Sequence, residues 1–382
     1  MLRNKDKGIT LIALVITIII LLILAGISIS VLTNQGLFKN AKAAQNATEK
    51  AEEEQGQRLN EYEDEINKYL NNANEDEKIG LITDNINKEL SKTDNTKLKD
   101  EKGNRIVVPA GFKIVNGATT VDKGIVIEDV TETATKGSQF VWIPVGTITK
   151  SDGTTATITL GRYDFDSTTG KESAYSGSYI EEDTNDASTL KKWGNTIAKN
   201  ITKFKNSVAT NGGYYIGRYE ARTATARSAA GNALTQITEK GTENVYNYVT
   251  QLQAAQLSQN MYNNDNFTSD LMNSYAWDTA TVFIQNCGTN AKYSRQISLN
   301  TSLLQTGTNS LTDTSKIDVQ CNIYDMASNI LEWTTETTDS SSFPCVYRGG
   351  FYGNSDHYTS CRDGNSTSDS NVIVGFRPLL YL

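Results

Sequence analysis

The strongest fold signal of this chain is Tyr324-Asp-Met-Ala-Ser-Asn-Ile-Leu-Glu-Trp333, followed by Arg348-Gly-Gly350 and Gly375-Phe-Arg377. The last two motifs bracket residues 351–374, called the display segment below. It consists of Phe, Tyr, Gly, Asn, Ser, Asp, His, Thr, Cys, Arg, Val and Ile, and it contains His357, the only histidine of the chain. Small polar and aromatic residues are typical of a recognition surface rather than of a packed core.

Composition narrows the classes of function. The length of 382 residues allows two or three domains. The net charge of −8 argues against nucleic acid as a partner. The four cysteines, Cys287, Cys321, Cys345 and Cys361, include no Cys-x-x-Cys pair, so a zinc ribbon is excluded. They allow either disulfides or free thiols, and the sequence leaves both open.

An apolar run lies near the N-terminus. Residues 8–35 carry no charge, and seventeen of residues 9–32 are Ile, Leu or Val. Such a run is long enough to span a bilayer as a helix, and a signal peptide would be shorter. Basic residues before it place the N-terminus in the cytoplasm. We predict a transmembrane helix over 9–32, continued as a polar helix to residue 70, that holds the rest of the chain outside a bacterial cell.

The start of this run, Lys7-Gly8-Ile9-Thr10-Leu11-Ile12, resembles the processing site of type IV pilins and pseudopilins. The resemblance implies a leader over residues 1–8, cleavage between Gly8 and Ile9, anchoring in a membrane or pilus, and contacts with other pilin subunits. The family usually has Glu where this chain has Ala13, and that Glu helps a subunit join the filament. Cleavage, and a position at the tip or in the shaft, therefore stay open.

The middle of the chain is predicted to form a linker, or neck, followed by short strands and helices. Residues 71–107 are polar and charged, which predicts a linker. Strands are predicted over 124–128, 140–144 and 214–220 from β-branched and aromatic runs, whereas 162–186 is loop-like. Thr250 and Gln253 form a capping box that predicts a helix to about Met261. This mixture predicts an α+β domain over residues 108–382.

Several segments occur in the order typical of the formylglycine-generating enzyme (sulfatase-modifying factor) family. They are Phe140–Gly146, Gly217–Glu220, Tyr324–Trp333 and the two bracketing motifs. The resemblance implies a C-type-lectin-like fold with few helices and long loops. Its structural frame maps onto Trp333, Arg348, Gly349, Gly350, Gly375, Phe376 and Arg377. The two arginines are planar donors suited to tying loops together.

The resemblance also implies a calcium loop. Its positions map onto the carboxylates of Asp325 and Glu332 and the main-chain carbonyls of Ser328 and Ile330, where Ser328 replaces the usual Gly. Oxygen ligands in one tight loop suit this hard cation. In the alternative interpretation, Asp325 caps a turn and Glu332 pairs with an arginine.

Enzymatic members of the family bind copper through two cysteines, whose positions here hold Asn354 and Thr359. Cys361 stands alone, and copper(I) needs soft thiolates. We therefore expect no copper and no enzymatic activity of that kind. A Ser-His-Asp hydrolase using His357 is disfavoured because no nucleophile-elbow motif accompanies it.

Catalytically inactive proteins of this fold include the variable proteins of diversity-generating retroelements, whose codons are rewritten at template adenines. Every residue of the display segment belongs to the set that such codons encode, and a fixed Ser/Asn/Asp-rich loop fits as well. We predict a surface adhesin or receptor that binds a protein or glycan ligand. The alternatives are a structural minor pilin and an enzyme of unknown reaction. The predicted contact residues are Tyr352, Asn354, Ser355, Asp356, His357, Tyr358, Ser360 and Arg362.

Overall fold

The chain divides into two units, Met1–Glu77 and Lys78–Leu382, which are considered separately. The structure, a computed structural model, describes residues 15–25, 42, 48 and 80–382, except 84–85, 116, 118, 184–199, 232–233, 263 and 305–317.

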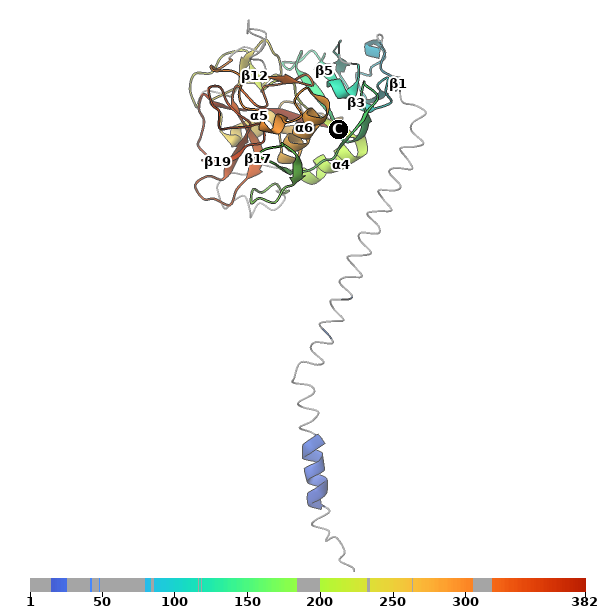
Figure 1. Ribbon diagram of the computed structural model, residues 1–382, viewed down its shortest axis with the longest axis vertical. Helices are drawn as coiled ribbons and strands as arrows, with labels where there is room; N and C mark the ends of the chain where they lie inside the picture. Colours follow the sequence, from blue (N-terminus) through green and yellow to red (C-terminus); the bar gives the residue numbers. More distant parts are fainter. Residues whose placement is uncertain are drawn as a thin grey trace, which may run out of the picture. The chain divides into compact units, whose positions relative to one another are not determined.

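In the first unit, residues 15–25 form a helix (Figure 1). No helix among the described residues has the length and apolar character needed to cross a membrane. The predicted spanning helix over 9–32, and the membrane-anchored surface location derived from it, are therefore wrong. The processing site at Gly8 and Ile9, and most of the extension to residue 70, lie outside the described residues.

The second unit is built around a six-stranded antiparallel sheet. Its strand order is β14-β21-β11-β6-β5-β4. The strands are β4 (Phe112–Ile114), β5 (Val126–Asp129), β6 (Gln139–Pro144), β11 (Gly213–Gly217), β14 (Thr268–Leu271) and β21 (Pro378–Tyr381). The runs predicted at 124–128, 140–144 and 214–220 supply β5, β6 and β11. Their β-branched and aromatic residues are buried because both faces of the sheet are covered.

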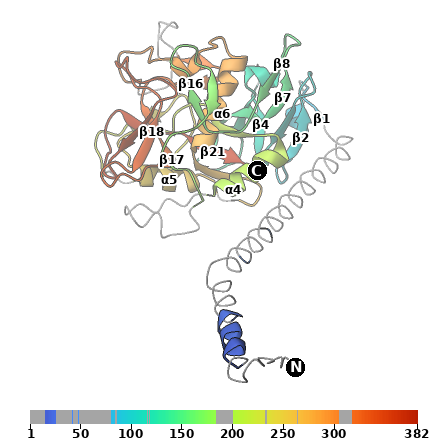
Figure 2. The same cartoon turned by 60° about the horizontal axis from the view of Figure 1, so that its bottom comes forward.

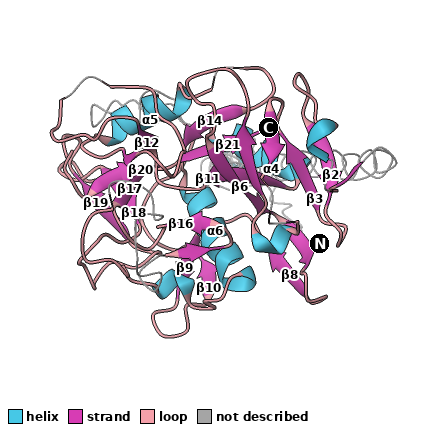
Figure 3. Cartoon of the chain, turned by 90° about the horizontal axis from the view of Figure 1, so that it is seen from above, coloured by secondary structure: helices cyan, strands magenta, loops and turns pink. Residues whose placement is uncertain are grey.

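A four-stranded sheet carries the C-terminal motifs. Its order is β19-β18-β17-β20, and β20 runs parallel to β17. The strands are β17 (Leu331–Thr337), β18 (Cys345–Arg348), β19 (Arg362–Asn365) and β20 (Val374–Phe376). This sheet lies at one end of the unit. A three-stranded sheet of β1 (Gly80–Leu81), β2 (Thr96–Lys99) and β3 (Arg105–Val108) lies at the other end (Figures 2 and 3).

Three α-helices are described in this unit, and each begins at a side-chain cap. They are α4 (Ile201–Asn211), α5 (Gln251–Gln259) and α6 (Ser274–Cys287), capped by Asn200, Thr250 and Asn273. The Thr250–Gln253 capping box is confirmed, with both of its hydrogen bonds formed. Most of α6 is buried among strands of the two sheets. Its polar side chains therefore contribute to packing and ion pairs instead of contacting solvent.

Short strand pairs complete the unit and move its boundary. They are β1 (Gly80–Leu81), β2 (Thr96–Lys99), β3 (Arg105–Val108), β7 (Gly146–Thr149), β8 (Thr155–Ile158), β9 (Tyr163–Phe165), β10 (Glu172–Ala174), β12 (Arg222–Thr223), β13 (Asn244–Val245), β15 (Val319–Gln320) and β16 (Ile323–Tyr324). Leu98 and Ile106 belong to the hydrophobic core. The compact unit therefore begins at Lys78 rather than at residue 108, and much of the predicted neck is folded. The α+β mixture of short strands, few helices and long loops agrees with the prediction.

Candidate functional site

The Arg348-Gly-Gly motif packs directly on the Tyr324–Trp333 segment. Gly349 has φ +83°, and a Cβ there would lie 2.7 Å from the carbonyl oxygen of Met326. A Cβ on Gly350 would lie 2.4 Å from the carbonyl oxygen of Ala327. Both glycines are thus required by close backbone approach, which holds the start of the display segment against the core.

Arg377 joins three segments in the core. Its guanidinium donates to both carboxylate oxygens of Glu332, at 2.6 and 3.0 Å, and to the carbonyl oxygens of Gly217 (2.9 Å) and Tyr324 (2.8 Å). Both charged side chains are buried. Burial alone would lower the pKa of Arg377, but its pairing with Glu332 raises that pKa above the ordinary value.

The predicted calcium loop has a different arrangement. Both oxygens of Glu332 are occupied by Arg377, and the hydroxyl of Ser328 donates to Asp325 at 3.1 Å. Asp325 is buried, has φ +63° and leaves Oδ2 without a hydrogen-bond partner in the described part of the chain. Ile330 donates its N–H to a glutamate carboxylate at 3.1 Å. No group of three His, Cys, Asp or Glu that could hold a metal occurs among the described residues. The pairing of Glu332 with an arginine, which the alternative interpretation gave, is therefore formed, whereas the calcium loop stays a prediction.

Buried carboxyl groups gather around this arginine. Burial raises the pKa of each of them: Glu220, Glu239, Asp318, Asp325 and Glu332. The pKa of Asp318 reaches about 7, because the neighbouring Asp325 adds to the effect of burial. Burial in this region therefore disfavours the charged forms of these acids, and at Glu332 the paired Arg377 opposes that effect.

A second ionic cluster supports the display segment. Arg348 donates to Asp278 of α6 at 2.6 Å and to the carbonyl oxygen of Cys361 at 2.7 Å. Arg362 pairs with the other oxygen of Asp278 and donates to Glu336 at 3.0 Å. These groups are almost fully buried. Burial and the adjacent Arg362 lower the pKa of Arg348 below its ordinary value.

A hollow of about 380 Å³ opens beside Arg362. We call it the tyrosine hollow, because Tyr163, Tyr175 and Tyr179 line it together with Ser360 and Arg362. The guanidinium of Arg362 stacks on the Tyr175 ring at 4.2 Å. Tyr179 donates its hydroxyl to the carbonyl oxygen of Arg362 at 3.1 Å. The β9–β10 hairpin and the display segment therefore form one continuous surface.

The loop before this hollow is fixed by local contacts. Asn354 Oδ1 accepts the N–H groups of Asp356 (2.7 Å) and His357 (2.9 Å), which closes a turn. The His357 ring contacts Phe351 edge-on at 5.4 Å, and its Nε2 lies 2.8 Å from Asp363 Oδ2. Since Nδ1 faces Asn354 Oδ1 at 3.2 Å, both ring nitrogens are engaged with oxygen acceptors. No ring nitrogen is left to activate a serine nucleophile.

Residues 358–361 are anchored from outside the loop. Arg295 stacks over the Tyr358 ring at 3.5 Å. Thr359 is buried, and its carbonyl accepts from the indole N–H of Trp277 at 2.8 Å. Cys361 Sγ accepts the N–H of Tyr358 at 3.1 Å, and burial raises the pKa of this thiol. A thiol is a poor ligand for copper(I), which needs the thiolate.

The predicted contact residues differ in accessibility. Ser355 and Asp356 are exposed; Tyr352, Asn354, His357, Tyr358 and Ser360 are half-buried. The Arg362 side chain is only 7% exposed, so it supports the surface from below and offers little contact area to a ligand.

None of the four cysteines forms a disulfide.

Sequence reasoning missed the tyrosines of the β9–β10 hairpin. Tyr163, Tyr175 and Tyr179 lie in the stretch that reads as a loop. Ser, Gly, Thr and Asp surround them there, as they surround the tyrosines of the display segment. That shared composition was the available signal.

Comparisons with known proteins identify distant structural neighbours. No family model and no curated protein matches the chain. Similar solved structures include Treponema denticola variable protein 1, with 13% identity, a TM-score of 0.33, and coverage of 65% of this chain and 98% of that one. PvdO from Pseudomonas aeruginosa has 12% identity, a TM-score of 0.35, and coverage of 64% and 95%. CarF has 12% identity, a TM-score of 0.32, and coverage of 63% and 97%.

Proposed function

We propose that this chain is a non-catalytic binding protein that recognises a protein ligand through the display segment and the tyrosine hollow. The observation that carries the proposal is the joining of two Tyr-, Ser- and Asp-rich segments, 163–179 and 352–362, around one hollow. Tyrosine provides contact area at low entropic cost, and Ser and Asn provide adaptable hydrogen bonds. A protruding side chain of the ligand would enter the hollow while the exposed loop contacts its surroundings.

The ionic cluster gives this surface a rigid base. Arg348 and Arg362 hold the ends of β18 and β19 to Asp278, so the loop between them is fixed at both ends. Preorganisation of this kind reduces the entropic cost of binding. The positions proposed to hold copper ligands in enzymatic relatives are instead a turn cap, Asn354, and a buried anchor, Thr359. These roles support binding rather than oxidation chemistry.

The same geometry supports the proposal that the segment is variable. Side chains that point outward, such as Ser355 and Asp356, can change without disturbing the core. Arg362 and Thr359 cannot, because one completes the ionic cluster and the other is buried. If the gene's 3′ end has a diversifying template copy, its adenines should fall in the codons of 352–358 and 360, and spare those of 359 and 362. A template with adenines spread evenly over the whole segment would contradict this proposal.

The binding test uses the full chain as bait in a selection from a phage-displayed library of folded protein domains. Selected clones are then measured against Ser355→Trp, Ser360→Trp and the control Thr155→Trp. Thr155 is an exposed residue of β8 that does not line the hollow. We expect both test variants to weaken binding by about tenfold or more, since a buried hot-spot contact contributes about 2 kcal/mol. Clones that bind all three variants equally would overturn the proposed function.

A further inference from the structure

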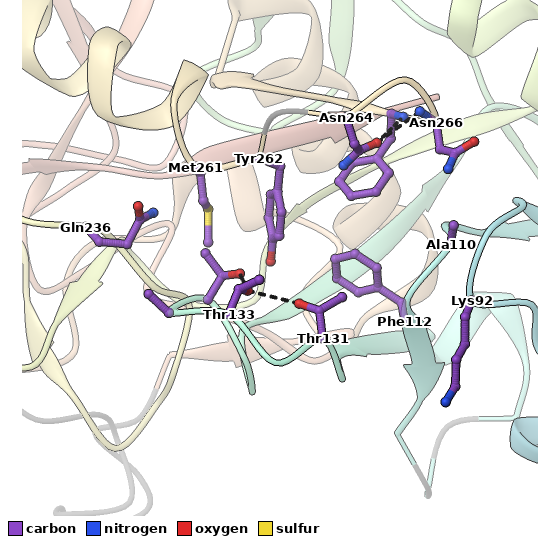
Figure 4. Close-up of a pocket in the computed structure, with 13 residues that line it drawn as sticks. Lys92, Ala110, Phe112, Thr131, Thr133, Gln236, Met261, Tyr262, Asn264 and Asn266 are labelled. Carbon is purple, nitrogen blue, oxygen red and sulfur yellow. Dashed lines mark hydrogen bonds between the residues drawn. The ribbon is translucent and has the colours of Figure 1, made fainter.

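A second cavity lies apart from the tyrosine hollow and shares no lining residue with it. We call it the aromatic pocket; its volume is about 490 Å³ (Figure 4). It forms where β4, the turn after β5 and the loop from α5 to β14 meet. The volume lies within the range of about 300–1,000 Å³ typical of small-ligand sites.

Three rings form the apolar side of the aromatic pocket. The centroids of Phe112, Tyr262 and Phe267 lie 5.3–5.7 Å from one another, in tilted and edge-to-face contacts. Phe112 and Phe267 are mostly buried, whereas Tyr262 is half-buried. Met261 continues this surface beside Tyr262 (Figure 4). The result is a fixed apolar wall that faces an open volume.

A buried carboxylate holds this wall in place without entering the pocket. Asp129 accepts hydrogen bonds from the hydroxyls of Thr131, Thr135 (2.6 Å) and Tyr262 (3.1 Å). Thr133 bridges the two other threonine hydroxyls at 3.0 and 2.8 Å. The Tyr262 ring and the threonine turn are therefore preorganised before a ligand arrives.

The lining also contains polar groups, but no carboxylate. It includes the amides of Gln236, Asn264 and Asn266 and the exposed ammonium of Lys92. Asn264 uses Oδ1 to accept the N–H groups of Asn266 (2.9 Å) and Phe267 (3.1 Å), which turns its Nδ2 donors away from that contact. Amide donors and acceptors beside an aromatic wall match a ring with hydroxyls on its edge and C–H groups on its face.

We infer that the aromatic pocket binds one saccharide unit, with a sugar face against Tyr262 and the sugar hydroxyls on the amides. Lys92 adds a site for the carboxylate of an acidic sugar, and the lining holds no acid to repel it. This inference does not depend on the proposed function of the display segment, because the two cavities have separate linings.

The experiment titrates the full chain with glucose, N-acetylglucosamine and glucuronic acid, followed by saturation-transfer NMR and calorimetry. Ala134 is exposed at the pocket lining, so Ala134→Trp fills the space without removing a core contact. Thr155→Trp is the matched control. We expect at least one sugar to bind the native chain and the control equally, and to bind Ala134→Trp about tenfold or more weakly.

A second variant separates recognition from folding. Asn264→Asp keeps the turn-capping oxygen but replaces the amide donor with a second acceptor and adds a negative charge. It should weaken neutral sugars severalfold and glucuronic acid more strongly, with an unchanged melting temperature. Absence of binding by all three sugars, or binding that Ala134→Trp leaves intact, would overturn the inference.

Discussion

The two arginine clusters of the C-terminal region use the same chemistry for different purposes. Arg377 forms a one-to-one bidentate pair with Glu332 inside the core, surrounded by further buried acids. Arg348 and Arg362 instead share Asp278 at the edge of the tyrosine hollow. The first pair joins strands, whereas the second supports a loop. One arginine cluster therefore stabilises the domain, while a separate one fixes the shape of its binding surface.

The largest expected effect concerns the core pair. Arg377→Met keeps the length of the side chain but leaves Glu332 buried without its partner. We expect a loss of about 3–5 kcal/mol in the free energy of unfolding, measured by urea denaturation. The control is Lys136→Met, which removes an exposed ion pair with Glu132 and should cost at most about 1 kcal/mol. Equal losses in the two variants would show that the core pair has no special role.

Arg362→Ala should have a smaller effect on stability and a larger one on binding. Arg162 and Arg348 still pair with Glu336 and Asp278 after the change. We therefore expect a loss of about 1.5–3 kcal/mol in the same denaturation experiment. The affinity for the selected ligands should also fall, because the stack of Arg362 on the Tyr175 ring is lost. A loss in unfolding free energy larger than that of Arg377→Met would show that the cluster around Asp278 contributes more to stability than the core pair does.

The core cluster should also make stability depend on pH. The pKa of buried Asp318 is about 7, whereas an unfolded aspartate titrates near its model value of 3.8. Because the folded state binds the proton of Asp318 more tightly than the unfolded state does, this group adds to the free energy of unfolding below pH 4. That contribution is lost as the pH rises towards 7. We expect the unfolding free energy to fall by on the order of 3 kcal/mol over this range from this group.

Asp318→Asn tests this dependence. The amide oxygen can still accept from Tyr293 and from the N–H of Ala327, but it no longer titrates. Melting curves between pH 4 and 7 should therefore be flatter for this variant than for the native chain. Asp356→Asn, on the exposed loop, should leave the native slope unchanged. An unaltered slope in Asp318→Asn would contradict the assignment.

The smallest stability effects are expected on the exposed loop. Ser355→Ala and Asp356→Ala should each change the free energy of unfolding by less than about 0.5 kcal/mol, because neither side chain supports the core. Thermal melts would check this directly. A loss above 1.5 kcal/mol in either variant would place the loop in the fold rather than on the recognition surface.

Local signals in the sequence predicted local structure well. The Thr250–Gln253 box marked the start of α5, and the run at 140–144 marked a central strand. Composition also distinguished the display segment from the core. The apolar run near the N-terminus led instead to a wrong prediction, since no helix among the described residues has the length and apolar character needed to cross a membrane. The neck prediction missed the pairing of residues 96–99 with 105–108, because the first of these strands is polar and buries only Leu98.

The sequence alone was enough to find the motifs at 324–333, 348–350 and 375–377, and to show that positions 354 and 359 hold no cysteine. The tertiary structure alone decided which charges meet. Arg362 finds Asp278 across 84 residues, and Arg162 finds Glu336 across 174. Pairing at such separations depends on the whole path of the chain, whereas propensity and periodicity act over a few residues. Composition alone therefore gives no reason to expect different exposure of Arg362 and Ser355. Only the folded chain buries the side chain of Arg362 and exposes that of Ser355.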